Sequence, residues 1–395
     1  MNDIQTLTAG FAAAFGTVPT RYFSAPGRTE IGGNHTDHQR GKVLAAAVNL
    51  DTRAAVGRNH LGVIRVLSQG HPMCQIRVGD WQPQPGEEGT TAALIRGVAA
   101  CFVQLGCPVG GFDAYVTSTV LPGSGLSSSA AFEVLMGTVI NALFFEGKAT
   151  PAEIAAMGQR AENVHFGKPC GLMDQMASAV GGLVTIDFAD PDAPKVQQVD
   201  FDFSACGYAL CIIDTGADHA DLTPEYGAIP AEMGKIANYF GKKVLSEVLE
   251  EKVYAALPAL RQTCGDRAVL RAIHYYNENR RVDAQVDALE RGDFEGFLEQ
   301  VRQSGRSSYM LLQNVIVPGR AGQEMALALA LCEKLLAGQG ACRVHGGGFA
   351  GTVQAFVPHD RLEDFCDSIE RVLGQGSCHV LDIRPQGGIE LDEKE

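Results

Sequence analysis

The chain has 395 residues, of which 46% are hydrophobic and 20% are charged, and this balance excludes a disordered protein. Its net charge of −14 excludes nucleic acid and anionic membranes as main partners, because both repel a polyanion. No apolar run approaches the roughly 20 residues of a membrane span. The polar N-terminus lacks a secretory pattern. Eleven cysteines without a C-x-x-C pair indicate reduced thiols rather than disulfides or a zinc site, so we expect a cytoplasmic protein.

The first half of the chain predicts mixed helices and strands. In chain order, the pattern predicts a helix over 1–20, strands at both ends of 21–57 around a long ordered loop from Pro26 to Gly41, and β structure over 61–80. It then predicts a helix over 90–105, a strand over 111–121, a buried helix that ends near Phe145, helices over 151–165 and 171–180, and a strand over 183–188.

The second half is predicted to be mostly helical. A polar, proline-containing stretch at 190–206 predicts a domain junction. Strand patterns recur near 208–214, 341–345 and 352–357. Strands and helices that mix without strict alternation favour an α+β fold over a doubly wound sheet.

The serine turn, Pro122–Ala131 (PGSGLSSSAA), lies between a predicted strand and the buried helix. Its glycines let the backbone approach a ligand, and its N–H groups and hydroxyls would meet an anion at the positive end of the helix dipole. One serine would suffice as an N-cap, so three serines after G-x-G favour phosphate over that plainer role. No G-x-x-x-x-G-K-[ST] occurs, so this is not a Walker A loop.

The glycine loop, His345–Gly351 (HGGGFAG), formally matches two other motifs. Its G-x-G-x-x-G spacing is followed by the strand-like TVQAFV, which argues against dinucleotide binding. Its HGGG has no accompanying G-x-S-x-G, which argues against an esterase. A hairpin turn and a ligand-lining loop are the two open interpretations, and the four glycines favour the second.

The histidine segment, Gly27–His38 (GRTEIGGNHTDH), concentrates Arg, Asn, two His and Asp. Converging donors and acceptors suit the hydroxyl groups of a sugar. A metal site at His35, Asp37 and His38 ranks lower, because an extended loop fixes no i,i+4 pair of ligands on one face. A solvated loop is the plain alternative.

Together these segments resemble the GHMP small-molecule kinases, and most closely the galactokinases. Galactokinases carry a pattern like G-R-x-N-L-I-G-E-H-T-D-Y, which the histidine segment resembles, and P-x-G-x-G-L-S-S-S-A, which the serine turn resembles. PCGLMDQ at 169–175 is similar to their P-C-G-x-M-D-Q, and the glycine loop is similar to their late G-x-G-F-x-G. The four matches are collinear and span residues 25–351.

The resemblance implies an α+β fold of two lobes with the active site in the cleft between them. An N-terminal, ribosomal S5 domain 2-like lobe would cover residues 1–205, and a C-terminal, ferredoxin-like lobe would cover residues 206–395. The late segment CHVLDIRP is expected to return to the first lobe.

The resemblance also implies an ATP-dependent sugar 1-kinase that uses Mg²⁺, with Asp174 as its catalytic carboxylate and Arg28 as the partner of that carboxylate. The sugar would contact Asn34, His35, Asp37, His38, Gly171 and Tyr226, and Gly346, Gly347 and Gly348 would lie near substrate or phosphate. ATP would contact Gly123, Ser124, Gly125, Leu126, Ser127, Ser128, Ser129 and Ala130, and the metal would be held by Ser129 and Glu162. Without these motifs, Asp174 would be interpreted as a first-turn acid and Glu162 as an exposed helix acid.

Two departures from the galactokinase pattern bear on the sugar. Asn34 stands where the pattern has Glu, and His38 stands where it has Tyr. In the family that Glu contacts the hydroxymethyl end of galactose, so its loss removes a negative charge near C6. Asn can donate to a C6 carboxylate, a cationic His38 would attract one, and plant galacturonokinases have a similar H-x-D-H-Q run. We therefore expect galactose as the substrate, with galacturonate as the close alternative.

A non-catalytic sensor of galactose and ATP is the alternative from another class. Such galactokinase-like regulators lost activity through a shortened Ser-Ala stretch, whereas Ser127–Ala131 is complete here. A GHMP kinase for another sugar or a small alcohol is a further alternative, although the H-T-D run disfavours mevalonate-type substrates. We expect a monomer whose partners are the sugar and ATP.

Overall fold

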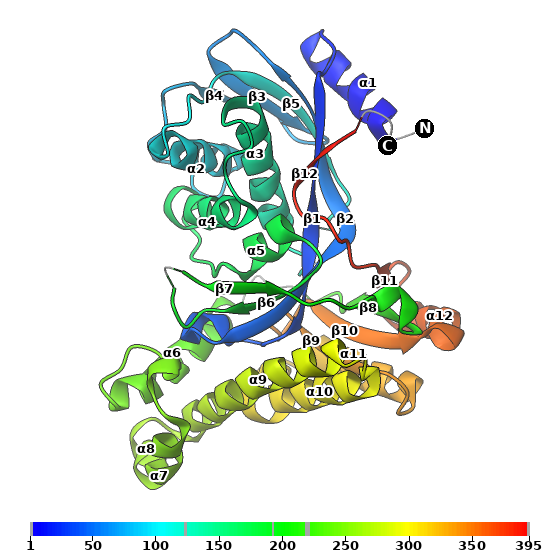
Figure 1. The fold of residues 1–395 in the computed structure, drawn as a ribbon. Helices are drawn as coiled ribbons and strands as arrows, with labels where there is room; N and C mark the ends of the chain where they lie inside the picture. Colours follow the sequence, from blue (N-terminus) through cyan, green and yellow to red (C-terminus); the bar gives the residue numbers. More distant parts are fainter. Residues whose placement is uncertain (1–2, 122–124, 192, 218–221, 393–395) are drawn as a thin grey trace.

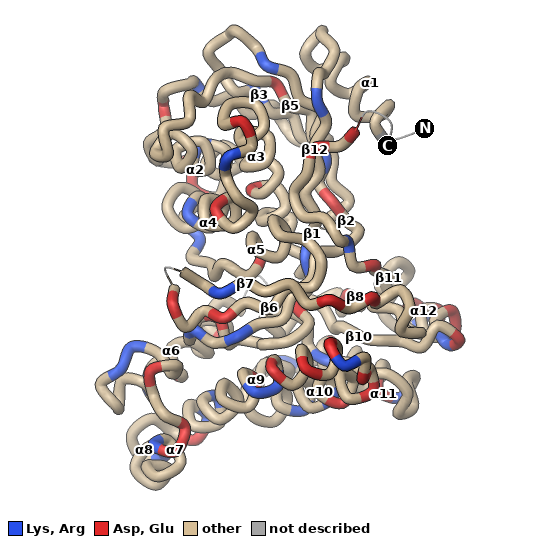
Figure 2. Tube along the Cα trace, viewed as in Figure 1, with Lys and Arg blue, Asp and Glu red and all other residues tan. Residues whose placement is uncertain are grey.

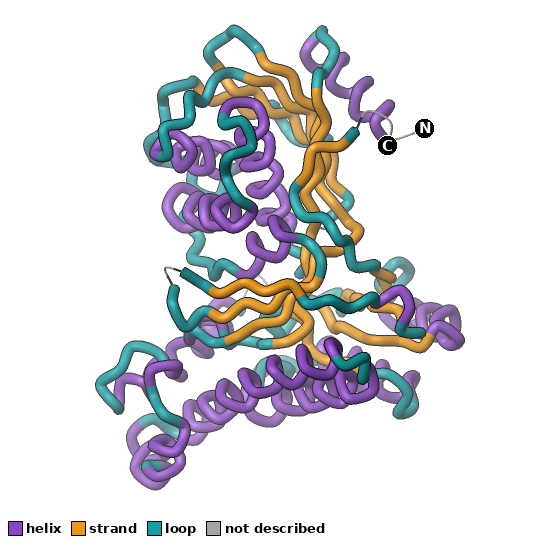
Figure 3. The backbone as a smooth tube through the Cα atoms, viewed as in Figure 1, coloured by secondary structure: helices purple, strands orange, loops and turns teal. Residues whose placement is uncertain are grey.

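The computed structural model describes residues 3–121, 125–191, 193–217 and 222–392. These residues form two β-sheets, each packed against helices (Figure 1; Figure 3). The larger sheet has eight strands and the smaller has four. The predicted α+β architecture of two lobes is confirmed. Among the described residues, no helix combines the length and the apolar character needed to cross a bilayer.

The larger sheet is mixed and is organised around one long strand, β2. Its path runs β12-β1-β2-β5-β3-β4, and β6 pairs with β2 and β7 beside that path. Strands β3 and β5 are parallel. The strands are β1 (Arg21–Gly32), β2 (Lys42–Arg58), β3 (Val63–Ser68), β4 (Cys74–Arg77), β5 (Phe112–Ser118), β6 (Leu183–Asp187), β7 (Lys195–Gln198) and β12 (Ile389–Leu391).

Helices α2 to α5 cover one face of this sheet (Figure 1). Helix α3 is buried around almost its whole circumference, as predicted, because it lies among the sheet and the neighbouring helices. Thr150 and Glu153 begin α4 with a complete capping box. The helices are α1 (Asp3–Phe15), α2 (Thr91–Gln104), α3 (Ser128–Phe144), α4 (Pro151–Ala161), followed by the π-helical turn η2 (Glu162–Phe166), and α5 (Met173–Val180).

The smaller sheet is antiparallel in the order β11-β8-β10-β9 and separates two cores. On β8, Leu210 and Ile212 face the core shared with α9 and α10, whereas Cys211 and Ile213 face α11 and α12. Its strands are β8 (Tyr208–Asp214), β9 (Ala341–His345), β10 (Thr352–Pro358) and β11 (Cys378–Leu381). Its helices are α6 (Thr223–Tyr239), α7 (Glu250–Ala255), α8 (Leu257–Thr263), α9 (Asp266–Glu290), α10 (Phe294–Ser307), α11 (Glu324–Leu336) and α12 (Leu362–Leu373).

The two lobes share one hydrophobic core, so they meet along a packed surface. Ile31 of β1 and Leu44 of β2 are fully buried against Val282 of α9 and Phe297 of α10. Burial of such side chains contributes about 1.5–3 kcal/mol each. The end of β1 is thereby fixed at the junction of the lobes.

The predicted loop from Pro26 to Gly41 is wrong in its first half. β1 continues through Gly32 and stays paired with β2. Register shifts between Pro26 and Arg28 and between Glu30 and Gly32 absorb the residues that favoured a loop, as β-bulges do. Arg28 and Glu30 therefore stand on a strand, and the loop that follows is short and contains the 3₁₀ turn η1 (Asp37–Gln39).

The C-terminal segment crosses from the smaller sheet to the larger one. CHVL forms β11 beside β8, Ile383 then bridges to Val48, and β12 pairs with β1. Gly387 sits so close to the carbonyl of Ala179 that a Cβ atom there would collide with this backbone oxygen. The crossing therefore depends on the absence of a side chain at Gly387.

We expect Gly387→Ala to lower the free energy of unfolding by about 1–3 kcal/mol, because the backbone at Ala179 must move away from the new methyl group. Gly234→Ala in α6 is the matched control, since a Cβ there meets no atom within 4 Å. The control should be neutral or stabilising by up to about 1 kcal/mol. Denaturant unfolding of both variants checks this, and equal stabilities would contradict the close crossing.

Candidate active site

Arg28 on β1 and Asp174 in the first turn of α5 form a two-pronged ion pair. Arg28 Nε donates to Asp174 Oδ1 at 2.8 Å, and Nη2 donates to Oδ2 at 2.6 Å. Ser178, one turn further along α5, donates to the Pro26 carbonyl at 2.7 Å and holds the helix against β1. The Asp174 side chain keeps 29% exposure whereas that of Arg28 keeps 10%, so the carboxylate stays accessible to a small molecule.

Asp174 is held in its ionised form. Burial raises the pKa of its carboxyl, but the Arg28 charge, the Arg28 hydrogen bonds and a further one from the Ser127 hydroxyl outweigh burial and lower the pKa below its ordinary value. A carboxylate that only complemented a helix dipole would need no bidentate arginine. The geometry therefore favours a chemical role for Asp174.

The serine turn lies beside this pair. Gly123 and Ser124, both expected to contact ATP, lie outside the described residues. Gly125 has a φ of 72°, and its carbonyl accepts a hydrogen bond from Arg28 Nη1. Leu126 is buried, and its carbonyl accepts from the Arg28 backbone N–H at 3.0 Å. The turn and the ion pair are thus parts of one cluster.

The three serines do not serve as an ordinary helix cap. Ser127 occupies the N-cap position with a left-handed φ of 56° and makes no capping bond, while Ser128, Ser129 and Ala130 form the first turn of α3. The backbone N–H groups of that turn have no intrahelical acceptor, as at any helix start. This arrangement favours the anion-binding interpretation over the N-cap alternative.

Asn34 is buried and fully engaged by protein groups. Its Nδ2 donates to Glu30 Oε1 at 3.0 Å and to the Gly346 carbonyl at 2.6 Å. Its Oδ1 accepts from Asn314 Nδ2 at 3.0 Å and from Ser308 Oγ at 3.3 Å. Asn34 therefore joins the histidine segment to the glycine loop and has no donor left for a ligand.

His35 and Tyr226 also contact the glycine loop. His35 Nε2 bonds the Gly347 carbonyl at 3.0 Å, and Tyr226 Oη donates to the Gly348 carbonyl at 2.8 Å. A Cβ at Gly347 would lie 2.7 Å from the Tyr226 ring, so the loop needs glycine there. The carbonyls of Gly346 to Gly348 thus gather predicted sugar residues from two distant segments.

Asp37 and Gly171 lie side by side, although 134 positions separate them in the sequence. A Cβ added at Gly171 would collide with Asp37 Oδ2. This contact brings the histidine segment against the start of the PCGLMDQ motif that carries Asp174. The partly exposed Asp37 side chain therefore lies against the segment that leads into Asp174.

His38 is neutral at physiological pH. Burial, opposed by the Asp37 charge and reinforced by nearby His35 and His274, lowers the pKa of His38 to about 4. The expectation of a cationic His38 that attracts a C6 carboxylate is therefore not supported by its surroundings.

Glu30 and Arg343 form a buried ion pair that no motif singled out. Arg343 on β9 donates to the Glu30 carboxylate and, through Nη1, to the Ile31 carbonyl at 2.6 Å. The side chains are 7% and 0% exposed. A signal was present in the sequence, because the galactokinase pattern has Asn at the position of Glu30 and Glu at that of Asn34. The two residue types have exchanged places.

His274 on α9 forms a hydrogen bond with the backbone of the histidine segment, and it was not predicted from the sequence. Its Nε2 donates to the Asn34 carbonyl and its Nδ1 accepts from Ser307 Oγ, both at 2.9 Å. Burial lowers the pKa of His274 to about 4 although the Glu278 charge opposes it, so the ring is neutral. No sequence signal surrounds His274, because its role exists only through tertiary contacts.

Glu162 is buried, not an exposed helix acid. Its Oε1 lies 3.3 Å from Lys168 Nζ, and its Oε2 accepts from Gln175 Nε2 at 3.0 Å. The same amide donates to Glu133 Oε2 at 2.9 Å. Burial, followed by the Glu162 charge, raises the pKa of Glu133 to about 9, and its Oε1 has no partner among the described residues. Glu133 lies one helical turn beyond Ser129, so oxygen donors gather here.

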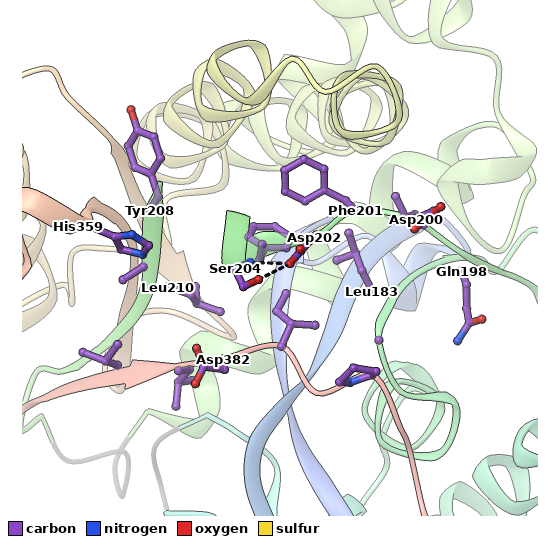
Figure 4. A pocket seen from close by; sticks show the side chains of 18 of the residues that line it. Leu183, Gln198, Asp200, Phe201, Asp202, Ser204, Tyr208, Leu210, His359 and Asp382 are labelled. Carbon is purple, nitrogen blue, oxygen red and sulfur yellow. Dashed lines mark hydrogen bonds between the residues drawn. The ribbon is translucent and has the colours of Figure 1, made fainter. Parts of the chain in front are cut away.

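A separate cavity of about 840 Å³ lies near β6, β8 and the C-terminal crossing (Figure 4). Leu183, Phe201, Tyr208 and His359 line it, together with Asp202, which accepts bonds from the backbone and side chain of Ser204. None of the predicted site residues that the structure describes lines this cavity. The candidate site is the cluster around Arg28 and Asp174.

Comparisons with known proteins define the class of the fold. The family model of the GHMP kinase N-terminal domain matches residues 93–182, and the galactokinase galactose-binding signature matches residues 9–58. A crystal structure of Lactococcus lactis galactokinase complexed with galactose has a TM-score of 0.83 at 24% identity, covering 98% of this chain and 100% of that one. A crystal structure of mevalonate kinase has a TM-score of 0.67 at 13% identity, covering 93% and 100%. The fold is that of the GHMP kinases.

Sequence relatives narrow the class further. A galactokinase of Streptomyces coelicolor is 33% identical over 391 residues, which cover 97% of each chain. A galactokinase of Glaesserella parasuis is 31% identical over 372 residues, which cover 92% of each chain. The chain belongs to the galactokinase family.

His274→Gln should lower stability at pH 7.5 by about 1–3 kcal/mol, because a buried hydrogen-bonding group is lost. The wild-type His274 stays neutral when folded but takes a proton near pH 6.5 when unfolded, so its contribution is lost as pH falls from 6.5 through about 4. The difference in the free energy of unfolding between the wild type and the variant should therefore become smaller as the pH falls over this range, by at most about 1.4 kcal/mol per pH unit. Denaturant unfolding at several pH values measures it, and a constant deficit would contradict a neutral His274.

Proposed function

We propose that this chain is an ATP-dependent kinase that transfers the γ-phosphate of ATP to the anomeric hydroxyl of galactose and produces galactose 1-phosphate. The observation that carries the proposal is the Arg28–Asp174 pair beside the serine turn, in a member of the galactokinase family. The matched galactose-binding signature supports the sugar assignment.

Asp174 is proposed as the general base. Phosphoryl transfer depends mainly on positioning and charge neutralisation, so a weak base suffices for an anomeric hydroxyl, which is more acidic than an ordinary alcohol. Arg28 keeps Asp174 ionised and places positive charge where negative charge develops on the transferred group. The serine turn and the N-terminus of α3 would hold the phosphates of ATP.

His35, Asp37, Gly171 and Tyr226 are proposed to surround the sugar, with the glycine loop as their support. Asp37 is half-exposed beside Gly171 and offers a carboxylate to the sugar hydroxyls. His35 keeps Nδ1 for a ligand while Nε2 bonds the glycine loop. We assign Asn34 to positioning rather than direct contact, because its amide is already bonded to protein groups.

Mg²⁺ is proposed as the ion that accompanies ATP, with Ser129 and Glu162 as its protein ligands. The donor set fits Mg²⁺, which prefers oxygen ligands and one or two carboxylates. The unpartnered Glu133 Oε1 is further support for a polar ligand at this point. When bound, Mg²⁺ would neutralise negative charge on the phosphates of ATP. Lys168 and Gln175 orient the Glu162 carboxylate.

Galactose is preferred over galacturonate on electrostatic grounds. The Asn34 amide has no donor left for a C6 carboxylate, and His38 is neutral. Glu30 places a carboxylate beside Asn34, but Arg343 neutralises it, and the Asn34 amide is occupied by this carboxylate and by the glycine loop. The relatives named above are galactokinases and do not support the galacturonate alternative.

The sensor alternative finds no support either, because the catalytic pair and the described part of the serine turn are in place. We propose a monomer as the working unit. All eleven cysteines are free thiols, which supports a reducing, cytoplasmic environment.

Asp174→Asn should lower kcat for galactose by about 100- to 10,000-fold, because the general base is lost while the side-chain shape is kept. Galactose binding should change little, since Asp174 is proposed to act in the chemical step. Asp266→Asn, an exposed residue at the start of α9, is the control and should keep wild-type activity. ADP release on addition of galactose and Mg·ATP measures the rate. A variant that keeps more than about a tenth of the rate would refute this role.

A substrate panel tests the sugar assignment. Galactose should be turned over with a kcat/KM at least about 100-fold above that for galacturonate, because Asp37 repels a second carboxylate and neither Asn34 nor His38 offers it a free donor or a positive charge. D-fucose, which lacks the C6 hydroxyl but adds no charge, separates the loss of a contact from repulsion. Galacturonate turnover equal to or faster than that of galactose would overturn the assignment, and sugar binding without ADP release would indicate a sensor.

A further inference from the structure

Three cysteines from three separate elements point their sulfur atoms at one another in the C-terminal lobe. Cys211 lies on β8, Cys366 on α12 and Cys378 on β11. Their Sγ atoms all lie within 4.8 Å of one another, and those of Cys366 and Cys378 are 3.3 Å apart. We refer to these three residues as the thiol cluster. It is distinct from the candidate active site, because Cys211 faces α11 and α12 on the other side of the smaller sheet.

The sheet geometry explains why the sulfurs converge. Cys378 pairs with Ile213 in the antiparallel ladder, and directly paired residues project to the same face. Cys211 precedes Ile213 by two positions and so projects to that face as well. Helix α12 covers this face through Phe365 and Ile369 and carries Cys366 over the two strands.

The separations match those of a single metal ion bound by thiolates. With metal–sulfur bonds of about 2.3 Å, thiolate ligands of one Zn²⁺ lie about 3.7–4.0 Å apart. The Sγ atoms of Cys366 and Cys378 are 3.3 Å apart and all three Sγ atoms lie within 4.8 Å of one another, so the cluster is close to this spacing. A disulfide, by contrast, needs its sulfurs at about 2.0 Å.

The surroundings also favour a cation. Helix α12 carries Glu363, Asp364, Asp367 and Glu370 against one arginine, and its acidic colour is visible in Figure 2. Cys211 is buried while Cys366 and Cys378 are half-buried, so an ion can reach the sulfurs from one side.

We propose that the thiol cluster binds one thiophilic metal ion, Zn²⁺ or Cu⁺, through Cys211, Cys366 and Cys378, with water in any remaining position. Thiolate ligands select these soft ions over Mg²⁺ or Ca²⁺. The ion would tie α12 to the middle of β8 and to the start of β11, the strand from which the chain crosses back to the larger sheet. The sequence did not predict this metal site, since the three cysteines are 12 to 167 positions apart and form no C-x-x-C pair.

Metal titration of the reduced full-length protein under anaerobic conditions tests the proposal. Zn²⁺ is titrated against a chromophoric chelator, and Cu⁺ is titrated in a parallel arm against a Cu⁺-specific chelator. Either arm should saturate at one ion per chain, and the tighter arm identifies the ion. Co²⁺ in place of Zn²⁺ should give the intense absorption of thiolate-to-metal charge transfer. A saturating ion should also raise Tm, because it binds only the folded chain.

Cys211→Ser, Cys366→Ser and Cys378→Ser should each weaken binding at least about 100-fold. Cys264→Ser is the matched control, because this half-buried thiol lies outside the cluster and bonds the Lys235 carbonyl. Retained galactose phosphorylation by each variant shows that it is folded. These variants leave the proposed kinase site intact, so loss of metal binding and failure of the proposed function are separate results.

Thiol alkylation of the wild-type protein gives a test that needs no variant. The bound ion should protect Cys366 and Cys378 from iodoacetamide, as read by peptide mass spectrometry, while Cys264 stays reactive. The proposal would be overturned if neither ion were taken up or if the serine variants bound the ion as tightly as the wild type. It would also be overturned if the ion did not protect Cys366 and Cys378 from iodoacetamide more than Cys264. A Cys366–Cys378 disulfide in the freshly isolated protein that, once reduced, takes up no metal would overturn it as well.

Discussion

The Glu30–Arg343 ion pair is the contact on which the arrangement of the two lobes depends. Both side chains are almost completely buried, so each charge requires its partner and additional hydrogen bonds to offset its loss of water. Arg343 meets the Ile31 carbonyl and Glu30 meets Asn34, which in turn bonds the glycine loop. The pair thereby connects the larger sheet to the smaller sheet and holds the histidine segment against the glycine loop. Removal of either partner would leave a buried charge at the centre of the junction.

Strand β1 connects this junction to the chemistry. Two residues before Glu30, Arg28 engages Asp174 and the carbonyl of Gly125. Because both arginine contacts originate from a paired strand rather than a loop, the carboxylate and the serine turn are held at fixed positions relative to the lobe junction. Preorganisation of this kind is what phosphoryl transfer needs, since catalysis there consists mainly of placing charges before the reaction begins.

The exchange of Asn and Glu between positions 30 and 34 alters the meaning of Asn34 for the choice of sugar. Considered alone, Asn34 suggests a pocket that has lost a carboxylate and is open to an acidic sugar. In the structure the carboxylate stands four residues earlier, where Arg343 neutralises it, and the Asn34 amide holds the glycine loop, so Asn34 leaves no free donor for an acidic sugar. His38 cannot compensate, because burial lowers its pKa to about 4. A neutral hexose is the better match to these electrostatics.

The sequence by itself determined the α+β class, most element positions, the serine turn, the histidine segment, and the choice of Arg28 and Asp174, because local periodicity and collinear motifs carry that information. It failed between Pro26 and Gly32, where glycine and proline favour a loop but pairing with β2 and two bulges keep the strand. Only the tertiary structure decided the buried state of Glu162, the roles of Glu30, Arg343 and His274, and the meeting of Cys211, Cys366 and Cys378. Burial, pKa shifts and contacts between distant strands arise from packing, and no local pattern encodes them.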